Sequence, residues 1–284
     1  MSAITIAAGD LDYIRELVLQ KSGIAIPPDQ SDDLVLRLQS LAHRRGLESV
    51  PDLLSVLWSG EDNQLPGCVI AAVTTGWPSF WCDAPIYELL KSAILPELLG
   101  ARQARRDLNV WYPNCGRGQG PHSLAILLRE HFPRAGAWKI RILATDRSPR
   151  LIEQAGTGCY GQAEVCRGLP AELLTRYFRP KGLEWQVDED LHNLLEFRTI
   201  NLADDWPATP AFDLIVLRNV LLYYDNEVRK GILARMRRRL RPDGYLVLGE
   251  GETIADSETD QEWALYHPPG CYQPRHVETA QAPS

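Results

Sequence analysis

From Asp107 onward, short apolar runs alternate with segments of helical periodicity. Three of these runs have the length and residue types of buried strands: DLNVWYP, WKIRILATD and FDLIVL. A helical pattern follows each run, such as HSLAILLREHF after the first. Buried strands that are separated by helices form a mostly parallel sheet with helices on both faces. We therefore predict an α/β domain in this part of the chain.

The loop after the first predicted strand carries three glycines at alternate positions, Gly116, Gly118 and Gly120. In open parallel sheets, ligands bind beyond the carboxyl ends of the strands, where this loop enters its helix. Dinucleotide-binding folds use Gly-x-Gly-x-x-Gly, and Pro121 occupies the position of the third glycine here. A hydride-transfer enzyme is therefore disfavoured. Gly-x-Gly-x-Gly is the usual form in S-adenosylmethionine-dependent methyltransferases.

Polar residues also end two other predicted strands. Asp146 closes the second strand, where a carboxylate can accept hydrogen bonds from both hydroxyls of a ribose. It could instead cap the next helix, but Ser148 followed by Pro149 fills that role better. Arg218 and Asn219 directly follow the run FDLIVL. The order of loop, aspartate and polar pair predicts a methyltransferase fold.

The chain is predicted to have three parts. Residues 1–68 form a small all-α domain, 69–106 a linker with a connecting helix, and 107–284 the methyltransferase-like domain. In the first part, the best loop candidate is the polar stretch SGEDNQLPG, 59–67. In the third part, the alternation of strands and helices is interrupted at about 158–198. There the helical PAELLTRYF precedes two extended pieces, LEWQV and LLEFRTI, which indicate a small antiparallel β-subdomain.

Composition excludes several classes of protein. The chain has 284 residues, 45% of them hydrophobic, and can bury a core without disulfides. Its net charge of −7 argues against nucleic-acid binding. Because none of the six cysteines forms a Cys-x-x-Cys pair, we expect no metal site and a reducing cytoplasm. No apolar run approaches the roughly 20 residues of a membrane span, and no signal peptide is expected.

Arginines cluster in three places despite the acidic balance. They form either solvated helix faces or a surface for an acidic partner protein. Helical spacing places Arg37 and Arg44 on an outward face. The clusters are Arg37, Arg44 and Arg45; Arg102, Arg105 and Arg106; and Arg235, Arg237, Arg238, Arg239 and Arg241.

Several longer stretches carry a more specific pattern. They include SGIAI, GPHSLAI, ATDRSPRLIEQAGTGCY, AELLTRYF and FDLIVLRNVLLYYDNEVRKGILARMRRRLRPDGYLVLGEGE. From roughly Leu11 to Arg275, the chain resembles the CheR family of chemotaxis receptor methyltransferases. These enzymes transfer a methyl group from S-adenosylmethionine to glutamate side chains on cytoplasmic receptor helices. The resemblance implies a small all-α domain followed by a Rossmann-like methyltransferase domain with an inserted β-subdomain.

The resemblance also implies roles for single residues. Asp146 matches the family's ribose-binding aspartate, and Asn201 with Leu202 matches the Asn-Leu pair beside the adenine. Tyr223 matches a tyrosine that faces the methyl donor and is expected to act in catalysis with Arg218 and Asn219. The implied cofactor is S-adenosylmethionine, with S-adenosylhomocysteine as product and no metal. The expected cofactor-binding residues are Gly116, Gly118, Gln119, Gly120, Asp146, Asn201, Leu202, Arg218, Asn219 and Val220.

The sequence departs from the family pattern where the methionine part of the cofactor would bind. The family reads Thr-Thr-Asn-x-Thr-x-Phe-Phe-Arg, and Gly76, Pro78 and Cys82 replace its Asn, second Thr and Arg. Gln119 replaces the first Glu of a Gly-Glu-Glu-Pro loop, which can pair with the cofactor's amino group. Losing one charge-assisted hydrogen bond costs about 1.5–3 kcal/mol. Arg117 is either a compensating cation or a solvent-facing loop residue.

Two main functions remain open. An active enzyme would methylate a receptor or sensor protein with acidic helices, and the β-subdomain could dock a receptor tail along a sheet edge. A catalytically degenerate relative would act in signalling by binding a nucleoside cofactor or a partner protein. Methylation of a small molecule, in a cleft lined by Trp77 and Trp81, is a further alternative; both tryptophans also fit a packing role. We expect a cytoplasmic monomer without membrane insertion.

Overall fold

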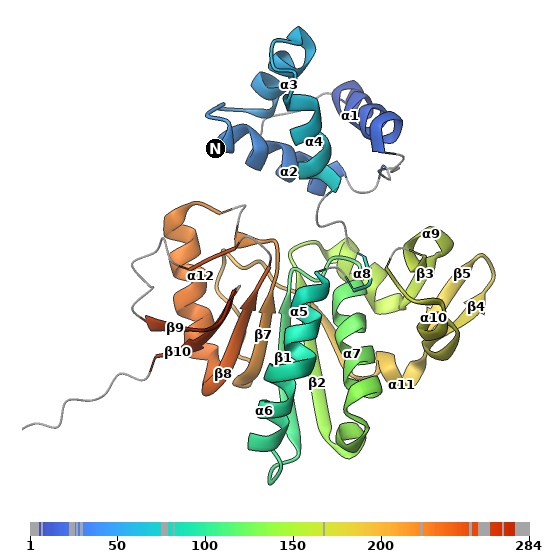
Figure 1. Ribbon diagram of the computed structural model, residues 1–284, viewed down its shortest axis with the longest axis vertical. Helices are drawn as coiled ribbons and strands as arrows, with labels where there is room; N and C mark the ends of the chain where they lie inside the picture. The colour runs from blue at the N-terminus through green and yellow to red at the C-terminus, as the bar shows by residue number, and fades with distance from the viewer. Residues whose placement is uncertain are drawn as a thin grey trace, which may run out of the picture. The chain divides into compact units, whose positions relative to one another are not determined.

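A computed structural model gives the structure of the protein. It describes residues 6, 8–22, 26, 28, 31–74, 79–81, 83–166, 168–221, 224–249, 252–254, 262–268 and 270–275. By its internal contacts the chain divides into two compact units, residues 1–77 and 78–284. Figure 1 shows helices in the first unit and a sheet with helices on both sides in the second.

The described part of the first unit is helical and has its own apolar core. It contains α1 (Ala8–Ser22), α2 (Ser31–Arg44), α3 (Val50–Ser59) and α4 (Leu65–Thr74). Ser49 caps α3 by accepting a hydrogen bond from Asp52 N at 3.3 Å, and Gly60 ends it with a φ of 69°. The loop expected over 59–67 is shorter, because α4 begins at Leu65. Arg37, expected to face outward, is only 7% exposed.

The second unit is built on a seven-stranded sheet with the order β6-β2-β1-β7-β8-β10-β9. Its first five strands pair in parallel, which confirms the predicted sheet. β10 runs antiparallel to both of its neighbours, a hairpin that the sequence pattern did not predict. The strands are β1 (Asp107–Pro113), β2 (Lys139–Asp146), β6 (Leu195–Thr199), β7 (Phe212–Leu217), β8 (Leu240–Leu248), β9 (Trp263–His267) and β10 (Cys271–Pro274).

Helices cover both faces of this sheet, and β1 shows how its residues are divided between them. Val110 and Tyr112 point into one core, and Trp111 points into the other. The first core contains α5 (Ala84–Leu89), a π-helical turn (Leu90–Ile94), α6 (Leu95–Ala101) and α7 (Gln119–His131). The second contains α12 (Asn226–Arg239). α8 (Pro149–Thr157) contacts β2 and β6.

A small antiparallel sheet of three strands forms the predicted β-subdomain. Its order is β3 (Cys159–Gly161), β5 (Glu184–Val187) and β4 (Phe178–Lys181). One part of the prediction is wrong: LLEFRTI does not pair with LEWQV but forms β6, which pairs in parallel with β2. The short helices of this region are α9 (Gln162–Val165), α10 (Ala171–Tyr177) and α11 (Glu189–His192).

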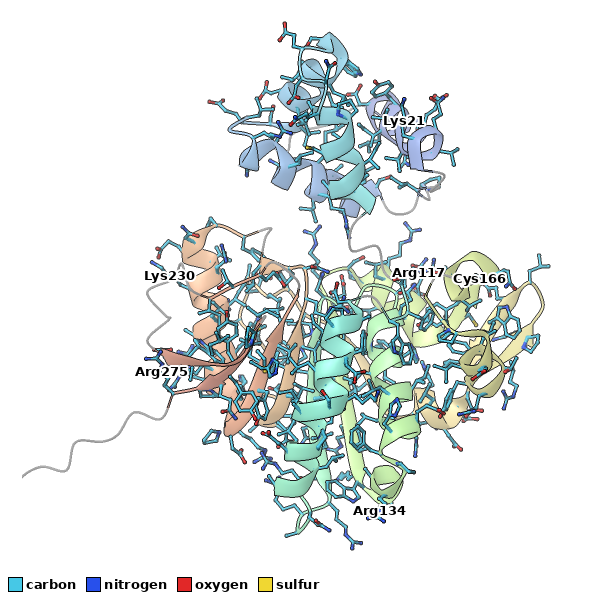
Figure 2. All side chains as sticks on the ribbon, viewed as in Figure 1. Lys21, Arg117, Arg134, Cys166, Lys230 and Arg275 are labelled. Atoms are coloured by element: carbon cyan, nitrogen blue, oxygen red, sulfur yellow. The ribbon has the colours of Figure 1, made fainter. Side chains whose placement is uncertain are left out.

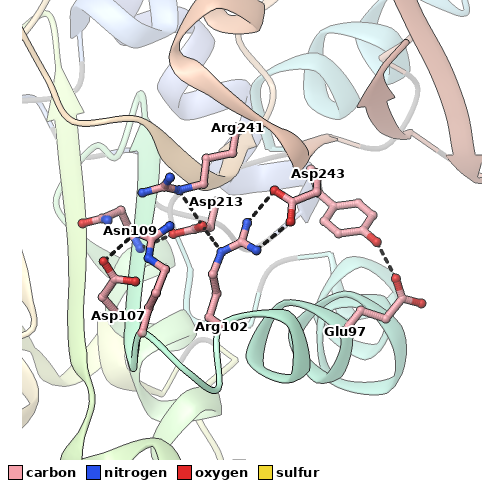
Figure 3. A network of polar contacts seen from close by, with 9 residues as sticks. Glu97, Arg102, Asp107, Asn109, Asp213, Arg241 and Asp243 are labelled. Carbon is pink, nitrogen blue, oxygen red and sulfur yellow. Dashed lines mark hydrogen bonds and ion pairs between the residues drawn. The ribbon is translucent and has the colours of Figure 1, made fainter. Parts of the chain in front are cut away.

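At the amino end of β7, a buried carboxylate connects three segments (Figure 3). Asp213 is fully buried and accepts hydrogen bonds from Asn109 N at 2.7 Å and from Arg102 Nε at 2.6 Å. Both terminal nitrogens of Arg102 donate to Asp243, at 2.6 and 2.7 Å. Arg241 Nε lies 2.9 Å from Asp213 Oδ1. Arg102 is thus buried in an ion-pair network and cannot belong to a partner-facing surface.

Candidate cofactor and active site

The glycine loop is sharply bent between the end of β1 and the start of α7. Gly116 and Gly118 have φ values of 55° and 92°, in the left-handed region that favours glycine. A Cβ on Gly118 would lie 2.9 Å from Tyr160 Oη, and one on Gly120 would overlap the phenol ring of Tyr112. The backbone shape and this close packing therefore account for all three glycines.

Asp146, at the carboxyl end of β2, connects the glycine loop to α8. Its Oδ2 accepts a hydrogen bond from Gly116 N at 3.0 Å, and its Oδ1 accepts one from Ser148 N at 3.0 Å. Ser148 caps α8 through Leu151 N, as predicted. A carboxylate has about four lone-pair positions, so Asp146 can hold the loop and still accept hydrogen bonds from a ribose. Burial, followed by the Asp146 charge, raises the pKa of the Cys115 thiol well above its usual range.

Asn201 and Leu202 follow β6, the neighbour of β2, and thus lie at the same edge of the sheet as Asp146. The Asn201 side chain accepts a hydrogen bond from Ala203 N at 3.2 Å and donates one to Asp204 at 3.0 Å. Leu202 is buried, and its carbonyl oxygen accepts a hydrogen bond from Arg235 at 2.8 Å. Arg235 therefore holds this loop in place.

Arg218 lies at the carboxyl end of β7 and is 8% exposed. Its Nε donates a hydrogen bond to Asp83 at 2.8 Å, and a second guanidinium nitrogen pairs with the same carboxylate. Its Nη1 donates to Tyr112 Oη at 3.0 Å, and its guanidinium lies 5.8 Å from the centre of the Tyr87 ring. Arg218 thus ties the start of α5 to the strand ends. Its contact with a cofactor remains a prediction.

Asn219 and Val220 are held by a residue that the sequence reasoning missed, Glu252. This carboxylate is 5% exposed and accepts hydrogen bonds from four backbone N–H groups. The donors are Asn219 at 2.7 Å, Val220 at 2.9 Å, Leu221 at 2.8 Å and Gly249 at 2.9 Å. Burial raises the pKa of Glu252, and the four N–H groups oppose that shift. One signal was available: Glu252 is the last residue of the long stretch, beginning at Phe212, by which the chain resembles the family.

Gln119 and Arg117 meet a second residue that the sequence reasoning missed, Glu164 of α9. Gln119 is 1% exposed, and its Nε2 donates a hydrogen bond to Glu164 Oε1 at 3.0 Å. Arg117 Nη1 lies 3.0 Å from the same oxygen. Arg117 extends from the glycine loop (Figure 2), and this ion pair decides against a purely solvent-facing role.

A buried histidine connects the glycine loop to the β-subdomain. His122 Nδ1 lies 2.8 Å from Gly118 O and 2.8 Å from Tyr160 Oη, and its Nε2 lies 3.1 Å from His192 Nδ1. Burial, followed by the charge on His192, lowers the pKa of His122 to about 3. His122 is therefore neutral at pH 7 and serves in packing and hydrogen bonding.

The segment before α5 packs tightly against this region. Trp81 N donates a hydrogen bond to Ser123 Oγ at 3.1 Å, and the Trp81 ring stacks on Tyr87 with centroids 5.7 Å apart. Phe80 is fully buried, 5.0 Å from Tyr160 and 5.5 Å from Phe178 between ring centroids. These contacts favour the packing role for Trp81. The predictions for Gly76, Trp77, Pro78, Cys82 and Tyr223 fall outside the described residues.

The described residues fit a nucleoside cofactor with a charged tail. Asp146 retains acceptor capacity for a ribose beside a loop that allows close approach. Arg117 Nε and Gln119 Oε1 are buried without a hydrogen-bond partner among the described residues, so this loop has an unmet donor and an unmet acceptor. In the same part of the chain, no group of three His, Cys, Asp or Glu could hold a metal ion. None of the described helices is both long and apolar enough to cross a membrane.

Comparison with known proteins gives consistent matches. Residues 78–266 match the family described as CheR methyltransferase, SAM binding domain. Chemotaxis protein methyltransferase Cher2 of Pseudomonas putida is 32% identical over 255 residues, 87% of this chain and 92% of that protein. Chemotaxis protein methyltransferase 1 of Pseudomonas aeruginosa is 32% identical over 253 residues, 87% of this chain and 91% of that protein. The chain therefore belongs to the CheR methyltransferase family, and residues 78–266 are its S-adenosylmethionine-binding domain.

Proposed function

We propose that the protein transfers a methyl group from S-adenosylmethionine to glutamate side chains of a chemotaxis-type receptor or sensor protein. Family membership and the names of the relatives support the reaction and its setting. The structural observation that carries the proposal is the arrangement of loops at the carboxyl ends of the parallel strands. There the glycine loop is hydrogen-bonded to Asp146, and the Asn219 backbone is held by Glu252.

The chemistry makes modest demands on the protein. A solvent-exposed glutamate has a pKa near 4.3 and is already ionised at neutral pH, so the reaction needs no general base. The cofactor supplies an activated methyl group when bound. The chain's own contribution is to position the two reactants and to exclude water between them. We assign the ribose to Asp146, the adenine side to Asn201 and Leu202, and orientation of the reacting groups to Asn219 and Tyr223.

We place the protein in the cytoplasm as a monomer. The receptor's acidic methylation helices are the proposed substrate, and the β-subdomain is a proposed docking site for a receptor tail. Among the residues that the structure describes, its outer strands, β3 and β4, pair with β5 alone. Each therefore keeps an edge to which an extended peptide can add as a further strand.

The first test is calorimetric titration of the cofactor-free protein with S-adenosylmethionine and S-adenosylhomocysteine. We expect micromolar binding, and we expect Asp146→Ala to weaken it by on the order of 100-fold, as loss of two charge-assisted hydrogen bonds predicts. Asp188→Ala is the matched control, because Asp188 accepts a backbone hydrogen bond at the start of α11. That variant should bind both ligands as the wild type does.

The second test is transfer of a labelled methyl group to a receptor cytoplasmic fragment. An active enzyme produces an alkali-labile methyl ester, and replacing the acceptor glutamates with alanine abolishes the labelling. Cofactor binding without transfer to any receptor fragment would instead support the catalytically degenerate alternative. No heat with either ligand at millimolar concentration would overturn the enzyme proposal.

A further inference from the structure

The carboxylate of Glu164 reaches the glycine loop from the β-subdomain. Its Oε1 accepts a hydrogen bond from Gln119 Nε2 at 3.0 Å and lies 3.0 Å from Arg117 Nη1. Its Oε2 accepts a hydrogen bond from Gly161 N at 3.0 Å, which fixes the carboxylate's orientation. The side chains of Arg117 and Glu164 are 19% and 20% exposed, so a ligand can approach the pair from solvent. A negative charge thus lies beside the residue that replaces the family's loop glutamate.

Two atoms of this cluster have unmet hydrogen-bonding capacity. Arg117 Nε is a buried donor and Gln119 Oε1 a buried acceptor, each without a partner among the described residues. Such atoms are rare in folded proteins, and each calls for a physical explanation. Reversing the Gln119 amide would not remove the problem, because its oxygen would then face the Glu164 carboxylate. A ligand that carries both a donor and an acceptor would satisfy the pair.

The amino-acid end of S-adenosylmethionine has the complementary groups. Its ammonium is a cationic donor that matches Glu164 and Gln119 Oε1, and its carboxylate is an anionic acceptor that matches Arg117. The position along the loop agrees with this match. Gly116 N is bound to Asp146, the proposed ribose ligand, and the next three residues lead from there to Gln119.

We propose that Glu164, with Arg117, recognises the amino-acid end of the cofactor in place of the missing loop glutamate. This inference rests on the proposed function, since it concerns the same cofactor. It gives the β-subdomain a second role: besides any receptor docking, it completes the cofactor site. It also identifies Glu164 as the residue that offsets the Gln119 replacement.

The test compares two ligands by calorimetry on the full-length protein. S-adenosylhomocysteine carries the amino-acid end, whereas 5′-methylthioadenosine keeps the adenosine and the thioether but lacks that end. We expect Glu164→Gln to weaken S-adenosylhomocysteine binding about 10- to 100-fold, the range of one charge-assisted hydrogen bond. Binding of 5′-methylthioadenosine should stay within about twofold. Glu153→Gln, at an exposed position on α8, is the matched control and should change neither affinity.

Three further variants sharpen the test, and the first of them keeps it decisive if Glu164→Gln folds poorly. Arg117→Gln should also weaken S-adenosylhomocysteine selectively, because it removes the partner of the cofactor carboxylate. Adding Gln119→Glu to Glu164→Gln returns a carboxylate to the loop and should recover most of the lost affinity. Gln119→Glu alone should gain little, because two carboxylates would then face each other across one hydrogen-bond distance.

The outcomes separate the two hypotheses. Equal weakening of both ligands by Glu164→Gln, or no weakening at all, would overturn the role of Glu164 and leave the proposed function standing. A wild-type protein that binds neither ligand would overturn the proposed function, and this inference with it. Selective loss of the ligand that carries the amino-acid end, with recovery in the double variant, would establish the assignment.

Discussion

The main sheet holds the buried Asp213, at its amino end, and the buried Glu252 and Asp146, at its carboxyl end, in different ways. At the amino end, Asp213 meets Arg102 and Arg241, so cations compensate its charge. At the carboxyl end, Glu252 accepts four backbone N–H groups, and Asp146 accepts N–H groups from Gly116 and Ser148. Ion pairs fasten segments together, whereas peptide N–H groups shape loops around a carboxylate. The difference predicts a stabilising amino end and a ligand-binding carboxyl end.

Two measurements on each variant test this contrast: the free energy of unfolding and the dissociation constant for S-adenosylhomocysteine. Variants at the amino end should change only the free energy of unfolding. Variants that remove a carboxylate at the carboxyl end should change the dissociation constant, alone or together with the free energy of unfolding. A variant that behaves otherwise would contradict the proposed difference between the two ends of the sheet.

The largest effect is expected for Asp213→Ala. Removing this carboxylate leaves the buried Arg102 without its inner partner, and such a change costs about 3–5 kcal/mol of unfolding free energy. Urea denaturation measures the loss. In the fraction that stays folded, the affinity for S-adenosylhomocysteine should change by less than about twofold, because distant sites act independently.

Glu196→Ala is the control for this prediction. Glu196 pairs with Arg198 at the surface, with side-chain exposures of 55% and 46%. Exposed ion pairs contribute at most about 1 kcal/mol. If Asp213→Ala also lowered the unfolding free energy by no more than about 1 kcal/mol, the assignment of the amino end to stability would be wrong. A large loss of affinity in that variant would contradict the assignment as well.

The next effect is expected for Glu252→Gln. Either oxygen of Glu252 serves two N–H groups, so an amide nitrogen in its place leaves two backbone donors without an acceptor. We expect a loss of about 1–3 kcal/mol in unfolding free energy. Affinity should fall as well, because the Asn219 backbone loses its anchor. An unchanged dissociation constant would show that this part of the carboxyl end is purely structural.

Much of the fold could be predicted from the sequence, because buried positions recur along a helix or strand and are occupied by apolar residues. Strands covered on both faces appear as continuous apolar runs, so β1, β2 and β7 were found. The glycine loop was found because left-handed backbone and close packing both require glycine. These signals are local, and each can be read within about a dozen residues.

Several of the errors concern contacts between residues that are far apart in the chain. β6 has alternating apolar residues, as an edge strand does, and nothing local shows that its partner is β2 and not β5. Glu252 and Glu164 lie 33 and 45 residues from Asn219 and Gln119, the residues that they contact. Arg218 was recognised as a polar residue directly after a buried strand, but its partner Asp83 is 135 residues away. Periodicity carries no information about such contacts.

A pH-dependent effect is expected at His122, on the carboxyl side of the comparison. Its pKa is lowered from 6.5 to about 3, so it stays neutral in the folded protein while the unfolded chain takes up a proton below pH 6.5. Its contribution to stability is therefore complete above pH 6.5 and is lost as the pH falls toward 3. The slope is at most about 1.4 kcal/mol per pH unit.

His122→Phe removes this titration while keeping an aromatic ring to stack on His192. Denaturation curves between pH 4 and 8 should show a shallower acid limb for the variant than for the wild type. His267→Phe, at an exposed position on β9, is the matched control. Identical acid limbs for wild type and His122→Phe would show that the buried ring does not resist protonation.

The smallest effect is expected for Ser148→Ala, which tests whether the helix cap or the backbone orients Asp146. The hydroxyl of Ser148 caps α8 through Leu151 N, whereas its backbone N–H donates to Asp146. The variant loses the cap and about 1 kcal/mol of unfolding free energy, but it keeps the N–H group. The affinity for S-adenosylhomocysteine should therefore stay within about twofold.

Ser49→Ala is the matched control, because Ser49 caps α3 of the first unit with the same chemistry. It should cost a similar free energy and leave the affinity unchanged. If Ser148→Ala weakened binding as strongly as Asp146→Ala, the orientation of the carboxylate would depend on the side-chain cap. The carboxyl end would then rely on side-chain contacts as the amino end does, and the contrast between peptide groups and ion pairs would fail at its most important residue.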